Sequence, residues 1–591
     1  MKTAYLFPAL LFLYILLFMT GLPNLKRCVL PAHSACGRSL GRVDAAIMAA
    51  VTLLYAGVAF TALGNTKSPE SFMPMWGESV EFEFEEETQI SKLMLFSGVG
   101  EGSYRFEGSA DGQSWFELGQ YEQNYVSVFK WNETVLICDT LVSHVRISGQ
   151  GAVYLGELVF FDRENRPVSV LSAPDVLCDE QTLAPARSNF LNSTYFDEIY
   201  HARTAWEHLN SVSPYEISHP PLGKLILSLG MLIFGVTPFG WRFMGTFLGC
   251  LMLPIVYVFA KKLFGGRAVP TLCSIVLASD FMHFVQTRIA TIDTYAVFFI
   301  LLMYLFMYLF VSCEGGPGSG RALLFLALSG AFFGMGAASK WTAIYAGAGL
   351  AVIWAVYWII NRRLGIRAFL KNSAFCLVFF VAVPALIYYL SYFAYGTAAG
   401  MKGIGMFFSR EYAQLVLDNQ SFMFNYHSGL VAEHPYSSRW YQWLLNIRPI
   451  LYYLEYFNDG TRSSFGAFVN PLLCWAGLLC LPLLVYTAAF RKDKTAAFIL
   501  LGYLAQLVPW MPIGRLTFEY HYFPCTVFLV LALGYVFKLV RLHSRHWKLY
   551  LGSFAAVSVL LFVMFYPAVS GMVVDNAKAS AILGWLPTWP F

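Results

Sequence analysis

The side chains best suited to chemistry lie in residues 195–224, which read YFDEIYHARTAWEHLNSVSPYEISHPPLGK. Asp197 and Glu198 form an adjacent acidic pair, and a His-Pro-Pro-Leu-Gly-Lys turn leads from them into apolar sequence. Two carboxylates beside membrane-like sequence are costly unless they are ion-paired or take part in a reaction. The pair is therefore a candidate active site, and the competing interpretation is a salt bridge to Arg203 or Lys224.

The composition indicates a polytopic membrane protein. Of the 591 residues, 57% are hydrophobic and 13% are charged, whereas soluble domains carry roughly 25% charged residues. Apolar runs of about 18 to 22 residues recur, and each is long enough to cross a bilayer core of about 30 Å. The net charge of +4 is too small to indicate a nucleic-acid partner.

Apolar runs and basic loops together predict the topology. Basic residues cluster in alternate loops, as they do on the cytoplasmic side of membranes, which places 64–239, 394–466 and the tail 571–591 outside. The predicted spans lie near 4–20, 43–63, 240–260, 267–283, 292–312, 322–338, 342–360, 369–393, 467–490, 495–511, 518–540 and 548–570. The first basic cluster comprises Lys26, Arg27, Arg38 and Arg42.

Two apolar segments are expected not to be ordinary spans. Residues 222–236 are too short to cross the bilayer, and we expect a helix that lies on the outer surface. Residues 4–20 could be an uncleaved anchor or a signal peptide, and the anchor is preferred because no small-residue cleavage site stands out. The predicted organisation is 1–42 (N-terminal membrane segment and cytoplasmic loop), 43–65 (first core helix), 66–170 (β-domain), 171–239 (outer loop with the acidic pair), 240–393 (transmembrane helices), 394–466 (second outer loop) and 467–591 (C-terminal helices and outer tail).

Residues 66–170 change to strand-like patterns. VEFEFEEETQISKLMLF alternates apolar and polar residues, and Asp111-Gly112 is a hairpin signal between two strand-like pieces. Short strands with turn signals predict a β-sandwich. SADGQSWFEL and VRISGQGAVYLGELVFFD resemble the discoidin domain, which often binds glycans; a structural cap without a ligand is the alternative. Trp115 or Trp131 could stack on sugars or be buried in the core.

The cysteines leave one question open. Most of them lie in apolar runs, but Cys138 and Cys178 lie in the long polar segment. In an oxidising compartment they could form one disulfide, or they could remain two free thiols.

Four further polar clusters lie on the side that the topology assigns to Asp197. They read TRIATIDTYA at 287–296, GAASKWTAIYA at 336–346, EHPYSSRWYQWLLNIRPIL at 433–451 and MPIGRLTFEYHYFP at 511–524. Chance would place about half of them on the other side, so their common side predicts a shared site.

With these motifs the chain resembles the protein O-mannosyltransferases, polyprenyl-phosphate-mannose-dependent enzymes of the GT-C class. The resemblance covers roughly 190–570 and rests on FDE, HPPLGK, ASKWT, HPYSSRW and GRLTFEYHY. It implies an all-α membrane core of about 11 helices plus one N-terminal helix, here with an inserted extracytoplasmic β-sandwich. The second outer loop shows no β-rich MIR-type insert, which is similar to the prokaryotic branch. The extra N-terminal segment and the sandwich leave the acceptor open.

The resemblance also implies the reaction. Mannose would pass from polyprenyl-phosphate-mannose to Ser or Thr hydroxyls of exported proteins, with inversion, at the extracytoplasmic face of the cell membrane. Asp197 matches the family's catalytic Asp and would take the hydroxyl proton, which is typically worth about 10²–10⁴-fold. Glu198 would orient a hydroxyl or a neighbouring cation. No cofactor is expected, and no metal constellation is visible.

Cations are needed where the phosphate leaves. Lys340 and Arg515 are the leading candidates, followed by Arg288 and Arg448, although each could instead reach lipid headgroups. Asp293 could pair with Arg288 rather than contact substrate. The sugar or acceptor pocket is expected to include His219, Lys224, Trp341, His434, Trp440 and His521.

Three other functions compete with this interpretation. A GT-C enzyme of another subfamily would move a different lipid-phosphate-linked sugar to a lipid or glycan. A transporter would place charges near the bilayer midplane, usually with internal repeats, and neither feature is visible. A glycan-binding protein anchored by one or two helices would leave about a dozen apolar runs unexplained.

Overall fold

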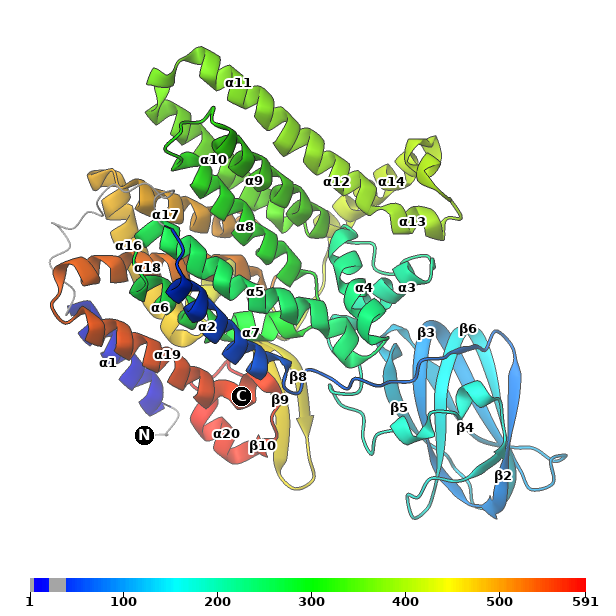
Figure 1. Ribbon diagram of the computed structural model, residues 1–591. Coiled ribbons are helices and arrows are strands. Elements are labelled where there is room, and N and C mark those ends of the chain that lie inside the picture. The colour runs from blue at the N-terminus through cyan, green and yellow to red at the C-terminus, as the bar shows by residue number, and fades with distance from the viewer. Residues whose placement is uncertain (1–4, 21–38) are drawn as a thin grey trace. The chain divides into compact units, whose positions relative to one another are not determined.

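A computed structural model describes residues 5–20 and 39–591 (Figure 1). The predicted cytoplasmic residues Lys26, Arg27 and Arg38 lie outside the described part. The chain divides into two compact units. The helical unit comprises Met1–Thr61, Ile217–Ile226 and Gly245–Phe591, and the strand-containing unit comprises Ala62–Glu216 and Leu227–Met244.

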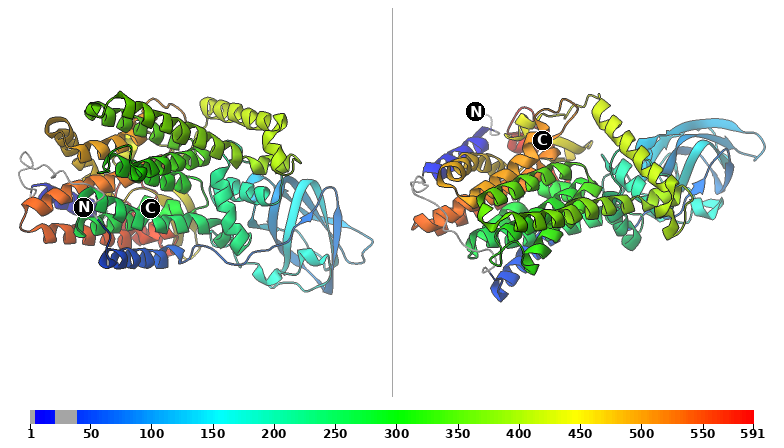
Figure 2. Two further views of the ribbon diagram at one scale, coloured as in Figure 1. Left: turned by 45° about the horizontal axis from the view of Figure 1, so that its top comes forward. Right: turned by 90° about the horizontal axis from the view of Figure 1, so that it is seen from above.

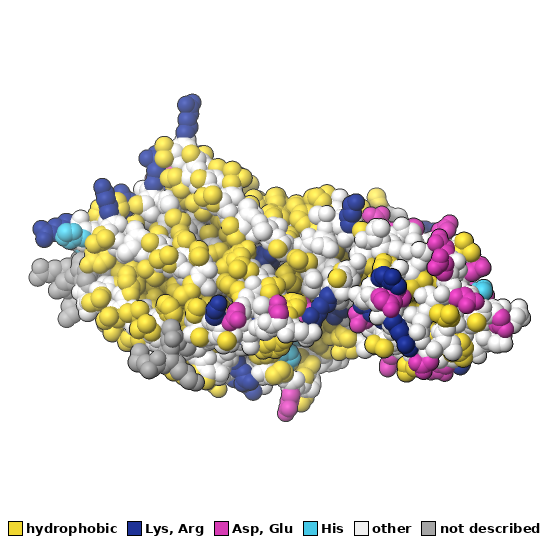
Figure 3. Space-filling view, turned by 90° about the horizontal axis from the view of Figure 1, so that it is seen from below, with side chains coloured by type: hydrophobic (Ala, Val, Ile, Leu, Met, Phe, Trp, Pro, Cys, Tyr) yellow, Lys and Arg dark blue, Asp and Glu magenta, His cyan; other side chains and the backbone are white. Residues whose placement is uncertain are grey.

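Within the described residues, nine helices are long and apolar enough to cross a membrane, or ten if a bent pair counts as one. Their long axes run side by side in Figures 1 and 2, and on the face drawn in Figure 3 hydrophobic side chains dominate the helical unit. The long helices are α2 (Arg42–Phe60), α5 (Pro238–Phe264), α8 (Asp293–Val311), α9 (Gly320–Ser339), α10 (Thr342–Ile360), the run Ile366–Ala398 with α11 (Ile366–Leu377), α12 (Val383–Ser391) and α13 (Phe393–Ala398), α16 (Pro471–Arg491), α18 (Phe523–His543) and α19 (Trp547–Ser570).

Burial separates central from peripheral helices. In the span Glu519–His543, 94% of the most apolar window is buried inside the protein, against 6% in the span Ile366–Ala398. Apolar side chains exposed along a spanning helix are compatible with lipid tails, which replace the protein core as their surroundings. The span that contains α18 is therefore the centre of the helical unit, whereas α11 and α12 lie at its edge.

Three predicted spans differ from uniform helices. The segment at 267–283 is two helices, α6 (Ala268–Ala278) and α7 (Phe281–Arg288), that meet at a 56° bend. At the bend Asp280 caps α7 by accepting from the His283 N–H at 3.1 Å, and a hydropathy count does not see such a break. The first segment is α1 (Leu6–Thr20), with 15 residues, and the segment at 495–511 contains α17 (Lys494–Leu507), with 14.

The segment 394–466, predicted as the second outer loop, is more structured than expected. It contains α14 (Arg410–Gly429), α15 (Trp440–Trp443) and a hairpin of β8 (Ile450–Tyr456) and β9 (Thr461–Ala467). The C-terminal tail adds β10 (Val574–Asp575) to this hairpin in the order β10-β9-β8, and then forms α20 (Asn576–Leu583). The tail then buries aromatic rings: Trp589 lies 5.0 Å from Phe468.

The predicted β-sandwich is confirmed. Its seven antiparallel strands run in the order β4-β3-β6-β2-β7, with β1 paired to β6 and β5 to β3. Register shifts interrupt both of the long strands β3 and β6, and the sheet encloses one apolar core. The strands are β1 (Met73–Pro74), β2 (Ser79–Thr88), β3 (Ile90–Ser109), β4 (Phe116–Gln123), β5 (Lys130–Val135), β6 (Val142–Asp162) and β7 (Val170–Ser172).

Local predictions in the sandwich have mixed outcomes. The Asp111 carboxylate accepts from the Gln113 and Ser114 N–H groups at 2.8 Å each, so the predicted turn between β3 and β4 is present. Trp131 is only 3% exposed, so sugar stacking by this ring is wrong. Cys138 and Cys178 are free thiols, so the disulfide alternative is wrong as well.

The segment after the sandwich, predicted as the first outer loop, contains two short helices. These are α3 (Glu198–Leu209) and α4 (Leu222–Phe234), and α4 matches the short helix predicted at 222–236. The acidic pair stands at the beginning of α3.

Candidate active site

Asp197 is the N-cap residue of α3 and is half-buried. Its carbonyl oxygen accepts from the Tyr200 and His201 N–H groups, both at 3.1 Å. The preceding residue, Phe196, has φ of +47°, a conformation that costs a non-glycine residue energy and is enriched at functional sites. A carboxylate is favourable at a helix N-terminus because the amide dipoles point toward it.

Glu198 has entirely different surroundings, because it is 0% exposed and ion-paired to Arg242, itself 1% exposed. The two carboxylate oxygens accept from Nε and Nη2 of Arg242 at 2.7 Å each, and Trp241 Nε1 donates at 3.2 Å. Bidentate pairs of this kind are short and strong. The cation beside Glu198 is therefore Arg242, a residue outside the motifs that predicted the site.

Arg242 in turn holds the backbone that leads to the acidic pair. Its guanidinium donates to the carbonyl oxygens of Leu63 at 2.8 Å, Phe190 at 2.6 Å and Ser193 at 3.0 Å. Arg203, one of the two cations suggested for the acidic pair, is bonded to Glu207 at 2.8 Å, and Lys224 donates to the His219 carbonyl at 3.1 Å.

The sandwich is fastened to the same loop. Thr194 donates from its N–H to the Phe129 carbonyl at 3.1 Å and from Oγ1 to the Val128 carbonyl at 2.6 Å. The Phe129 ring stacks on Trp241 with centroids 6.0 Å apart. The segment between η3 (Tyr125–Ser127) and β5 therefore holds Thr194, three residues before Asp197, in place.

One turn after Asp197, the half-buried Tyr200 is the middle ring of an aromatic stack. Tyr200 lies between Tyr125 at 6.0 Å and Tyr215 at 6.4 Å, with interplanar angles of 17° and 4°. The Arg203 guanidinium lies 3.8 Å from the Tyr215 ring centre. Tyr125 and Tyr215 are 40% and 39% exposed. Burial first, and then Tyr125 and Asp197, raise the pKa of Tyr200, so its hydroxyl stays protonated.

In the helical unit, Lys340 ends α9 and is only 7% exposed. Its ammonium donates to both oxygens of Asp293 at 2.8 Å and lies 5.4 Å from the Tyr520 ring centre. The suggested pairing of Asp293 with Arg288 is therefore wrong. Arg288 instead donates to the carbonyl oxygens of Ala59 at 3.0 Å and Thr61 at 2.9 Å.

A histidine that the sequence analysis missed lies among the predicted pocket residues. The His427 ring is 5.1 Å from His219 and 6.1 Å from Trp341, and its Nε2 lies 2.8 Å from the Ser218 carbonyl. Burial first, and then the charges of His219, Arg515 and Lys340, lower the pKa of His427 to about 4. These contacts bring His219, Trp341 and His427 together, but a single histidine in a polar helix carries no sequence signal of its own.

The remaining predicted residues form a second group. His521 is buried and stacks on Trp443, centroids 6.0 Å apart, while His434 lies edge-on to Phe518 at 5.0 Å. Arg448 donates to the Pro435 carbonyl. Arg515 and Trp440 are half-buried; Arg515 donates to the Leu516 carbonyl at 3.3 Å. The contacts of Arg448 and His434 stabilise the segment 394–466 in which both residues lie.

Comparison with known proteins decides the family. Residues 218–388 match the family described as dolichyl-phosphate-mannose-protein mannosyltransferase, and residues 413–589 match the C-terminal four TMM region of protein-O-mannosyltransferase. This chain belongs to the protein O-mannosyltransferase family. Neither matched region includes the sandwich or Asp197.

Relatives and a solved structure agree with this family. The polyprenol-phosphate-mannose–protein mannosyltransferase of Mycobacterium tuberculosis is 24% identical over 477 residues, which is 69% of this chain and 90% of that protein. The protein of the same name from Corynebacterium glutamicum is 25% identical over 460 residues, 67% of this chain and 88% of that protein. The Saccharomyces cerevisiae Pmt1-Pmt2 complex bound to the sugar donor has a TM-score of 0.57 at 14% identity, covering 67% of this chain and 89% of that one. The predicted GT-C membrane core is thereby confirmed.

Proposed function

We propose that this protein O-mannosyltransferase moves mannose from polyprenyl-phosphate-mannose to Ser or Thr hydroxyls of exported proteins. The relatives that match most of the chain carry names that state the donor and a protein acceptor. The observation that carries the assignment of the catalytic residue is the contrast within the acidic pair. Glu198 is ion-paired to Arg242, whereas Asp197 is half-buried at a helix N-terminus beside exposed rings.

Asp197 acts as the general base. The acceptor oxygen attacks the anomeric carbon, the bond from that carbon to the phosphate oxygen breaks, and polyprenyl phosphate leaves with the electron pair. Asp197 takes the hydroxyl proton. One displacement inverts the anomeric carbon, and a negative charge is favourable at the helix N-terminus where Asp197 lies.

The phosphate is bound by Lys340 together with Arg515. Lys340 has Asp293 as its ionic partner in the described structure. An incoming phosphate would be a second acceptor for the same ammonium group. An ammonium has three donors, so it can bind both anions. Negative charge on the leaving phosphate grows in the transition state. The contact with Lys340 is therefore stronger in the transition state than in the ground state, which accelerates the reaction.

The stacked rings of Tyr125, Tyr200 and Tyr215 are the proposed acceptor surface, on the extracytoplasmic face of the membrane. Flat aromatic surfaces bind extended peptide chains with little loss of side-chain entropy, because each ring has few rotatable bonds. The sandwich contributes Tyr125, so it belongs to the acceptor site instead of acting as a separate cap. Glycan binding by the discoidin-like sandwich stays a prediction.

The test is direct transfer. Purified full-length protein is incubated with polyprenyl-phosphate-mannose and Ser/Thr peptides, and products are identified by mass spectrometry. Asp197→Asn is compared with Asp139→Asn, which changes an exposed Asp of the sandwich (side chain 89% exposed). Mannosylated peptide from the wild type and from Asp139→Asn, but not from Asp197→Asn, is expected. Transfer to lipid acceptors instead of peptides would contradict the proposed acceptor class.

A further inference from the structure

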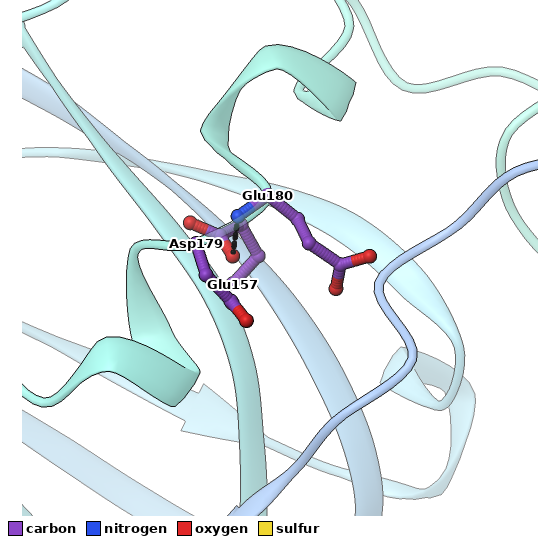
Figure 4. Close-up of side chains that lie close together, drawn as sticks. All are labelled: Glu157, Asp179 and Glu180. Atoms are coloured by element: carbon purple, nitrogen blue, oxygen red, sulfur yellow. Dashed lines mark hydrogen bonds between the residues drawn. The ribbon is translucent and has the colours of Figure 1, made fainter.

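Three carboxylates from separate parts of the strand-containing unit meet at one place. Glu157 lies in β6, while Asp179 and Glu180 lie in the segment that leads from the sandwich toward α3. One oxygen from each of the three lies within 4.8 Å of the others (Figure 4). No ion pair of the described residues includes any of them, so their negative charge is not compensated by protein cations.

Glu157 supplies a second observation. The side chain is 1% exposed, its Oε2 accepts from the Glu180 N–H at 2.9 Å, and its Oε1 is buried without a hydrogen-bond partner among the described residues. Buried polar atoms are nearly always satisfied, so an orphan of this kind needs an explanation such as an ion. Burial first, and also the charges of Asp179 and Glu180, raise the pKa of Glu157 to about 7, which shows how unfavourable the bare cluster is for a carboxylate.

We propose that Glu157, Asp179 and Glu180 form a calcium site. Ca²⁺ binds 6–8 oxygen atoms at about 2.3–2.6 Å, so oxygens on opposite sides of one ion are about 4.6–5.2 Å apart. The spread of 4.8 Å is compatible with three ligands of a single ion, and second carboxylate oxygens and water complete its shell. Mg²⁺ is usually held by one or two carboxylates plus waters.

Zinc fits the donor set less well. Structural zinc sites are usually built from Cys and His side chains, whereas the three ligand atoms gathered here are carboxylate oxygens.

The ion would have a mechanical role. Glu180 Oε2 also accepts from the Glu70 N–H at 2.9 Å, and Gln181 Nε2 donates to the Leu158 carbonyl at 3.1 Å. The cluster thus joins the chain that enters the sandwich, strand β6, and the chain that leaves it. A bound cation stabilises this junction without touching the transfer chemistry, so the inference does not depend on the proposed function.

Full-length protein in detergent is stripped with a chelator and titrated with CaCl₂ by calorimetry, with MgCl₂ as the second arm. We expect a dissociation constant of about 10⁻⁴–10⁻³ M, the range of extracellular calcium modules. Glu157→Gln should bind at least tenfold more weakly, and Asp179→Asn, which changes an exposed residue, should weaken binding in the same direction. Glu122→Gln, at an exposed position of β4, is the matched control and should bind as the wild type does.

Thermal unfolding separates a lost ligand from a lost fold. In chelator, Glu157→Gln should unfold at the same temperature as the wild type or higher, because it removes a buried charge while the amide oxygen still accepts from Glu180. Added Ca²⁺ should raise the unfolding temperature of the wild type and of Glu122→Gln only. No calcium binding by the wild type, unchanged binding by both cluster variants, or equal binding of Mg²⁺ would overturn the proposal.

Discussion

Two of the buried ion pairs among the described residues, Arg242–Glu198 and Lys340–Asp293, differ in how many partners each cation has. Arg242 binds Glu198 and three backbone carbonyl oxygens, and both side chains of the pair are at most 1% exposed. Lys340 forms hydrogen bonds to Asp293 alone among the described residues, and the side chains of that pair are 9% and 14% exposed. Arg242 is held by five acceptor atoms and cannot leave them. Lys340 has one anionic partner in the described part of the chain and can bind a second anion. We therefore expect the first pair to maintain the fold and the second to bind the phosphate of the proposed donor.

Asp197 and Glu198 differ in burial, since Asp197 is half-buried and Glu198 is 0% exposed, and the largest effect should come from the more accessible carboxylate. Asp197→Asn should lower peptide mannosylation by about 10²–10⁴-fold, because the amide cannot take the hydroxyl proton. Donor binding and the unfolding temperature should stay near wild-type values. Initial rates from mass spectrometry check this, with Asp139→Asn as control, and a wild-type rate in Asp197→Asn would remove it as the base.

Breaking the Arg242–Glu198 pair should affect stability instead. Arg242→Ala leaves Glu198 buried without its cation, which costs about 3–5 kcal/mol and should leave little folded protein. Thermal unfolding in detergent measures the loss. Glu198→Leu combined with Arg242→Met should recover part of it, since replacing both partners by apolar groups removes the unpaired charge. If Arg242→Ala melts like the wild type, the pair is not the anchor described here.

The exchangeable pair should affect donor affinity. Lys340→Ala should weaken binding of polyprenyl-phosphate-mannose by about tenfold, equivalent to about 1.4 kcal/mol, and Arg515→Ala should act in the same direction. Asp293→Asn should not weaken donor binding, because it removes a negative charge beside the incoming phosphate. Equilibrium binding of a labelled donor tests all three variants, and unchanged affinity in both cation variants would exclude them from the phosphate site.

The smallest effect concerns pH. The folded-state pKa of His427 is lowered to about 4, chiefly by burial, whereas an unfolded histidine has a pKa near about 6.5. The unfolded chain therefore binds the extra proton first, so this contribution to stability is complete above pH ~6.5 and is lost as pH falls toward about 4. For a half-exposed side chain the loss is on the order of 1 kcal/mol, because water screens the charge. His427→Gln should make the unfolding temperature depend less on pH between these values. An unchanged pH dependence would contradict the assignment.

Patterns between near neighbours predicted much of this architecture. Long apolar runs indicate spans because one helix must satisfy its own backbone in lipid, and the Asp111-Gly112 turn was visible because its hydrogen bonds are local. The same patterns missed the break at Asp280 and the hairpin β8–β9, because apolar composition does not distinguish a span from a bent helix or a buried strand. Asp197 was found through its motif, and its half-burial was not needed to find it.

The amino-acid sequence alone determined the membrane class, the inserted β-domain, the family motifs and the choice of Asp197. Only the tertiary structure decided which distant residues form ion pairs and hydrogen bonds with one another. Arg242 lies 44 residues from Glu198, Lys340 lies 47 residues from Asp293, and Thr194 lies 66 residues from Val128. The physical reason is that hydropathy and propensity record the preferences of neighbouring residues, whereas an ion pair or a buried carboxylate cluster depends on how distant segments pack.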